Sequence, residues 1–75
     1  MTVVEMILST MKTGETVTHY KKGNSNFFLR TLEDGAYLLD KVTKGCSCGV
    51  CCGDEEKINQ YIRENKLKVA EILHK

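Results

Sequence analysis

The chain has 75 residues, 41% of them hydrophobic and 28% charged, and a formal net charge of +1. This composition is that of a globular protein and excludes a disordered chain. The sequence has no basic stripe or tail, the usual sign of nucleic-acid binding. A core this small provides little stability, so we expect an additional stabilising element: a bound metal, a disulfide or a partner subunit. The length predicts one domain over residues 1–75.

The first ten residues have no basic start, and Glu5 interrupts their apolar run, so they do not have the pattern of a secretory signal. No window approaches the ~18 apolar residues of a membrane span. We therefore expect a cytoplasmic protein without membrane association. Its thiols should stay reduced there, which favours metal binding or redox chemistry over a structural disulfide.

The N-terminal segment predicts a helix over residues 3–12. Thr2 and Glu5 have the spacing of a capping box, in which the Thr2 hydroxyl accepts from the Glu5 amide. Apolar residues then recur on one helical face at Val3, Val4, Ile7, Leu8 and Met11. Gly14 is placed to end the helix.

The middle of the chain predicts a three-stranded antiparallel meander over residues 15–22, 26–33 and 36–43. Gly23-Asn24 and Asp34-Gly35 are the expected two-residue hairpin turns. The second turn sets a register that can be checked. One face pairs Leu32 with Tyr37, Arg30 with Leu39 and Phe28 with Lys41, and the other pairs Phe27 with Val42, Leu29 with Asp40 and Thr31 with Leu38.

Both faces of this meander are substantially apolar, so each needs a cover. The two terminal helices could take one face each. Alternatively, both helices could pack on one face and leave the other as a dimer interface, and we favour a homodimer. His19 is expected on the Phe28 face, as an ordinary sheet residue rather than a ligand.

The C-terminal segment predicts a second helix that begins at an Asp54 cap. Its apolar face holds Ile58, Tyr61, Ile62, Val69, Ile72 and Leu73. Asn65 interrupts this pattern, so residues 66–74 could instead form a fourth strand, although helix is favoured. The expected fold is α+β in the order α-β-β-β-α, with N- and C-terminal helices and a Cys-rich loop before the last helix.

All four cysteines lie between Gly45 and Gly53, in the pattern C-x-C-x2-C-C. Thiolates bind thiophilic ions, and zinc prefers four tetrahedral ligands. The candidate metal ligands are Cys46, Cys48, Cys51 and Cys52, with Gly49 shaping a C-x2-C knuckle. The side chains of the adjacent residues Cys51 and Cys52 point apart. A site for a single ion would therefore use three of the four cysteines, with His19, His74 or a ligand from a second subunit. The C-x-C and C-C spacings are similar to those of metallothionein-like clusters, in which sulfurs bridge several ions.

Two other uses of the segment stay open. Cys48-Gly-Val-Cys51 resembles the C-G-x-C of thioredoxin-like proteins, although the element order does not suit that fold, so the resemblance implies at most a thiol redox switch. The cysteines could also be small apolar residues of a metal-free interaction module, such as an adaptor or inhibitor. No catalytic constellation is evident. The sequence therefore predicts a small non-enzymatic binding or regulatory protein whose Cys-rich loop binds zinc or another thiophilic metal ion, and whose partner is another protein.

Overall fold

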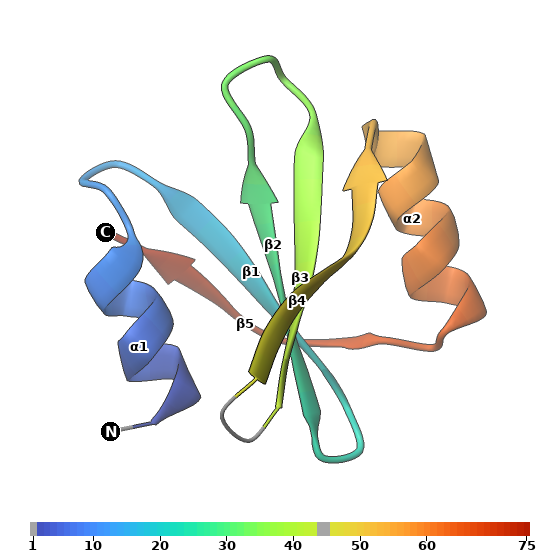
Figure 1. The fold of residues 1–75 in the computed structure, drawn as a ribbon, viewed down its shortest axis with the longest axis horizontal. Coiled ribbons are helices and arrows are strands. Elements are labelled where there is room, and N and C mark those ends of the chain that lie inside the picture. Colours follow the sequence, from blue (N-terminus) through green and yellow to red (C-terminus); the bar gives the residue numbers. More distant parts are fainter. Residues whose placement is uncertain (1, 44–45) are drawn as a thin grey trace.

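The computed structural model describes residues 2–43 and 46–75. Within these residues the elements are α1 (Val3–Thr10), β1 (Thr16–Lys22), β2 (Ser25–Thr31), β3 (Tyr37–Thr43), β4 (Cys46–Gly53), α2 (Glu55–Glu64) and β5 (Lys68–His74). The strands form one antiparallel sheet in the order β4-β3-β2-β1-β5. Figure 1 shows α1 and α2 on opposite sides of this sheet. The α+β class is confirmed, with five strands in place of three.

Both helices begin at the caps that the sequence predicts. The Thr2 hydroxyl accepts from the Glu5 amide at 3.1 Å, and the Asp54 carboxylate accepts from the Lys57 amide at 2.9 Å. Each bond satisfies an amide that has no partner within its own helix. The described part of the chain contains no helix long and apolar enough to cross a membrane.

The two hairpins differ in how well the sequence predicts them. Gly23 and Asn24 form the expected two-residue turn, with Lys22 opposite Ser25. The next loop has three residues rather than two, because the Leu32 amide donates to the Ala36 carbonyl at 2.7 Å. Gly35 closes this loop at φ +85°. This geometry is that of a three-residue hairpin loop with glycine in the left-handed region.

The extra loop residue moves β3 by one position along β2. The observed pairs are Phe28 with Asp40 and Leu29 with Leu39, so the expected register is wrong. A one-residue shift exchanges the faces of every side chain in the strand. Val42 therefore joins Phe28 on the α1 side of the sheet, and Leu39 lies on the α2 side.

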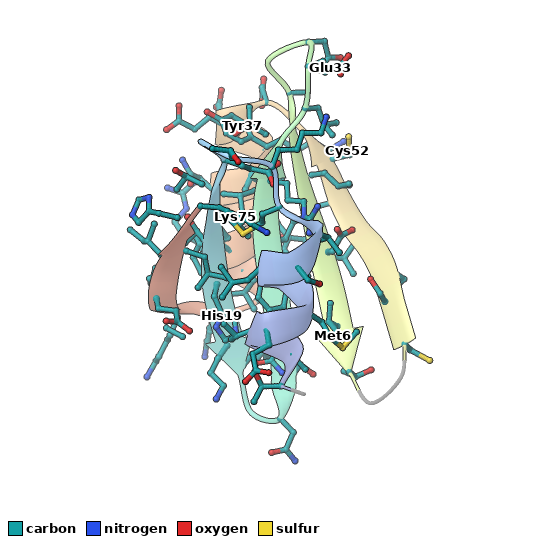
Figure 2. The ribbon with its side chains drawn as sticks, turned by 90° about the vertical axis from the view of Figure 1, so that its left-hand side faces the viewer. Met6, His19, Glu33, Tyr37, Cys52 and Lys75 are labelled. Carbon is teal, nitrogen blue, oxygen red and sulfur yellow. The ribbon has the colours of Figure 1, made fainter. Side chains whose placement is uncertain are left out.

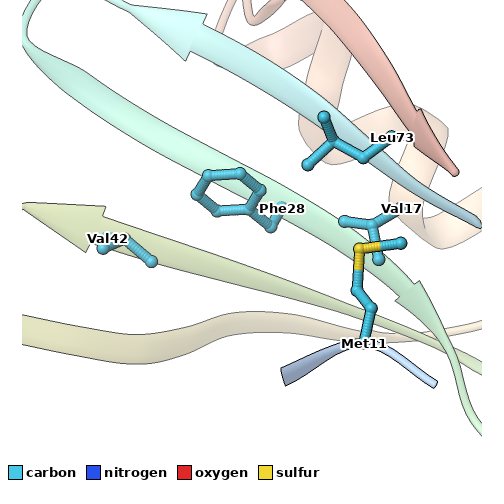
Figure 3. Close-up of a cluster of buried hydrophobic side chains, with 5 residues drawn as sticks. All are labelled: Met11, Val17, Phe28, Val42 and Leu73. Carbon is cyan, nitrogen blue, oxygen red and sulfur yellow. The ribbon is translucent and has the colours of Figure 1, made fainter. Parts of the chain in front are cut away.

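Each face of the sheet has its own core under its own helix. The α1-side core comprises Met11, Val17, Phe28, Val42 and Leu73 (Figure 3), and the apolar face of α1 packs against it. The α2-side core comprises Phe27, Leu39, Ile58 and Leu67. One helix per face is thus the arrangement that the structure adopts.

The favoured C-terminal helix over residues 66–74 is wrong, because α2 ends at Glu64 and the chain returns as β5 beside β1. The Leu67 amide donates to the Ile62 carbonyl at 3.0 Å, and the Lys66 amide donates to the Arg63 carbonyl at 3.2 Å. These two bonds form a Schellman motif. Lys66 takes the left-handed position at φ +55°.

A β-bulge explains why β5 looked helical in sequence. The pairing with β1 passes from His19–Glu71 to Tyr20–Val69 and leaves Ala70 as the extra residue. The bulge places Val69 and Ile72 on the same face although they are three residues apart. A spacing of three is the helical signature, so the apolar pattern pointed to the wrong element.

Candidate functional site: the cysteine strand

The four cysteines lie on β4, an edge strand of the sheet. Figure 2 shows β4 along the outer side of the sheet, with β3 as its neighbour. The expected Cys-rich loop is therefore wrong for Cys46–Gly53, and its first residue, Gly45, lies outside the described residues. The segment is extended because it pairs with β3 along its length, and because Val50 and Cys51 pack against the α2-side core.

Pairing with β3 decides the face of each thiol. Opposite pairs are Cys46 with Thr43, Cys48 with Lys41, Cys51 with Leu39, and Cys52 with Leu38. Directly opposite residues share a face of the sheet. Since Leu39 belongs to the α2-side core, three of the thiols lie on the α2 side and that of Cys52 lies on the α1 side.

A β-bulge at Val50 sets this distribution. The pairing passes from Asp40–Gly49 to Leu39–Cys51, so Val50 has no residue directly opposite. In a regular strand, residues three apart face opposite ways. The bulge restores Cys48 and Cys51 to one face. The C-x2-C spacing, which predicts a knuckle in a loop, here belongs to a bulged strand.

Solvent exposure separates the thiols further. Cys46, Cys48 and Cys52 are exposed, whereas Cys51 is half-buried against the α2-side core. Cys51 therefore contributes to packing as a small apolar side chain. Cys46 and Cys48 are the two exposed thiols that share a face.

Gly49 does not shape the strand in the way that a knuckle requires. A Cβ at Gly49 would lie 3.5 Å from Leu38 Cδ1 and 3.6 Å from Asp40 Oδ1, which are ordinary van der Waals contacts. Gly53 is different, since its φ is +156° and a Cβ would lie 2.7 Å from Lys57 Cδ. The backbone constraint of this segment is therefore at its end, where the chain turns into α2.

Within residues 2–43 and 46–75, no group of three or more His, Cys, Asp or Glu side chains is arranged to hold a metal ion. The strand geometry explains this, because the three thiols on the α2 side are spread along the extended strand, with Cys46 and Cys51 roughly 16 Å apart along the chain. Neither histidine approaches the thiols: His19 lies on β1, three strands away, and His74 lies on β5 at the other edge. While β4 is extended, a metal site with four ligands therefore needs donors from outside the chain.

The C-G-V-C pair is likewise held apart by the strand. Three residues of extended chain span about 10 Å between the α-carbons of Cys48 and Cys51, and a bulge shortens this only slightly. A disulfide needs its α-carbons within about 7 Å. Closing that pair requires β4 to leave its extended conformation.

The sequence analysis did not consider that β4 carries no charged residue. No residue from Cys46 to Gly53 is charged and none is proline, whereas the other edge, β5, carries Lys68 and Glu71. Edge strands are usually blunted by charges or prolines, because their free backbone groups can pair with another chain. The absence of charge was readable in the sequence, but its meaning depends on knowing that β4 is an edge.

No protein-family model, no curated protein and no solved structure matches this chain. The chemistry of β4 is therefore the basis for assigning a function.

Proposed function

We propose that this chain is a small non-enzymatic binding protein that uses the cysteines of β4 to bind zinc or another thiophilic metal ion. One observation carries the proposal: all four thiols lie on one uncharged edge strand, and three of them are exposed. Thiolates are the preferred protein ligands of soft and borderline metals. In the reducing compartment that the sequence predicts, exposed thiols remain available as ligands.

The donors are not equivalent. Cys46 and Cys48 share the α2 side and are exposed, so they are the primary ligands. Lys41 lies opposite Cys48 on the same face, and its ammonium offsets the negative charge of bound thiolates. Each cysteine releases a proton on binding, and the metal then stabilises the strand that carries it. Such coupling between loading and local order suits a regulatory or sensing role.

The test is native mass spectrometry with elemental analysis on anaerobically purified protein. We expect a mass increase equal to bound metal at fixed stoichiometry. Cys46→Ser combined with Cys48→Ser should abolish that increase, whereas Cys52→Ser, on the opposite face, should retain it. Reduced wild-type protein that takes up no added zinc would overturn the proposal.

A metal-free interaction module is the second candidate, and a separate surface favours it. Val69 and Ile72 of β5 are 59% and 54% exposed and lie on the same side of the sheet. A large exposed apolar pair of this kind suits contact with another protein. A variant with all four cysteines changed to serine separates the candidates, since an interaction module should keep its melting temperature and its partner. A thiol redox switch would instead lose the mass of two hydrogen atoms when an oxidant such as diamide forms a disulfide, and would regain it on reduction.

A further inference from the structure

We propose that two copies of this chain pair edge to edge through β4, and that the exposed thiols of both copies together complete the metal site. The metal part of this inference rests on the proposed function. The pairing part rests on the edge itself, so the two parts can fail separately.

The edge of β4 is open to a second strand of the same kind. β4 has β3 on one side and no strand on the other within the described residues. Figure 1 shows the first half of β4 running clear of α2, and the bulge at Val50 leaves Cys46–Gly49 as a regular stretch. Because this stretch is uncharged, two copies of it meet without electrostatic repulsion. The charges of β5 make the opposite edge a poorer candidate.

The thiol site is incomplete in one copy. A single chain presents two exposed thiols on one face, at Cys46 and Cys48, and no group of three donors exists among its described residues. A two-fold axis doubles the number of thiols from two to four. Four thiolates are the ligand set of a closed structural zinc site.

The two-fold axis also fixes which residues meet. Antiparallel pairing about Ser47 places Ser47 opposite its own copy, and Cys46 opposite Cys48 of the second copy. Opposite residues share a face, with Cβ atoms about 5 Å apart. Cys46 and Cys48 of both copies then place their four thiols together on the α2 side of a continuous ten-stranded sheet. Cys52 faces the other side and takes no part.

The first test measures mass and metal together. Wild-type protein, fully reduced, is examined by size-exclusion chromatography with light scattering and by native mass spectrometry, with and without added zinc. Ser47→Lys places two like charges directly opposite each other, so it should convert dimer to monomer and remove bound zinc. Val69→Lys adds the same charge to the other edge and is the matched control, which should stay dimeric. Circular dichroism confirms that both variants are folded.

The outcomes separate the two parts. Zinc found only in the dimeric species, and lost with it in Ser47→Lys, supports the inference. A wild-type monomer that still binds zinc overturns the pairing and leaves the proposed function standing. A dimer that is sensitive to Ser47→Lys and takes up no zinc overturns both the shared site and the proposed function. A dimer broken by Val69→Lys and not by Ser47→Lys overturns the β4 interface.

A second measurement does not depend on a charged variant. Protein with Cys51→Ser and Cys52→Ser retains only Cys46 and Cys48. Mild oxidation with diamide, which takes up the two hydrogens as each disulfide forms, should give a covalent dimer in which peptide mapping links Cys46 to Cys48 of the other copy. Cross-links confined to a single chain, or links of each cysteine only to itself, contradict the proposed register.

Discussion

His19 and Phe28 stack across β1 and β2, with ring centroids 4.6 Å apart and ring planes 10° from parallel. The two residues are opposite partners in the sheet, so His19 lies on the Phe28 face as expected from the sequence, and the structure shows that α1 covers this face. His19 Nε2 also lies 2.9 Å from Asn26 Oδ1, while Nδ1 is 3.8 Å from the Glu71 carboxylate. Figure 2 shows His19 on the side of the sheet that carries α1. This pair therefore fixes the β1–β2 hairpin beneath the helix.

Replacing His19 with alanine should destabilise the protein by about 2 kcal/mol, from the lost stacking and hydrogen bond together. Asn26→Ala removes only the acceptor and should cost about 1 kcal/mol. Because both changes remove the same bond, the double variant should cost less than the sum of the single variants. Urea denaturation of the four proteins measures this coupling. Strict additivity would show that the His19–Asn26 bond contributes nothing.

The phenol of Tyr20 should make stability fall at high pH. Burial raises the pKa of Tyr20 above its ordinary value of about 10. The folded state therefore holds this proton more tightly than the unfolded state, so its contribution is complete below pH 10. It is lost as the pH rises through the pKa of the folded protein. Tyr20→Phe should be less sensitive to pH in this window, as measured by denaturant melts at pH 8 to 11, and Tyr37→Phe controls for loss of a hydroxyl on the same face.

Lys66→Gly should stabilise the protein by about 0.5–1 kcal/mol, because Lys66 occupies a left-handed position that glycine adopts without steric cost. The Schellman hydrogen bonds do not involve its side chain. Lys66→Ala removes the same charge but keeps the Cβ, so it should give no such gain. Thermal melts compare the three proteins. Equal gains in both variants would assign the effect to charge rather than to backbone conformation.

Two glycines should respond differently to alanine. Gly35→Ala should cost about 1 kcal/mol or more, because its φ of +85° closes the β2–β3 loop. Gly49→Ala should be nearly neutral, since its Cβ meets only ordinary contacts at 3.5 and 3.6 Å. Chemical denaturation of the two variants measures the difference. A large loss in Gly49→Ala would indicate that this glycine has a role in the thiol strand beyond its space.

The parts of the fold that the sequence predicted depend on near neighbours. The Thr2 and Asp54 caps join a side chain to an amide three residues away. The Gly23-Asn24 turn joins strands that are adjacent in the chain. The loop at Asp34-Gly35 was located correctly but given one residue too few, and that error turned β3 over.

Neither edge strand was the favoured prediction from the sequence: β4 was expected to be a loop, and a strand over residues 66–74 was only the alternative to a helix. Each carries a bulge, at Val50 in β4 and at Ala70 in β5, and a bulge breaks the alternation by which strands are recognised. In β5 the displaced pattern imitated a helix. In β4 it put Cys48 and Cys51 on one face at a spacing that suggests a metal knuckle. The bulge in β4 can be located only once β3 is known to be its partner strand, and the bulge in β5 only once β1 is known to be its partner strand.

The sequence by itself determined the α+β class, the two helix starts, the first hairpin and the concentration of every thiol between Cys46 and Cys52. These features follow from hydrogen bonds and periodicities that span a few residues. The tertiary structure decided that β4 and β5 are strands, that β3 presents Leu39 to α2, and that Cys52 faces away from the other thiols. Those outcomes depend on the register between strands, which pairing across the sheet sets and which no local pattern encodes.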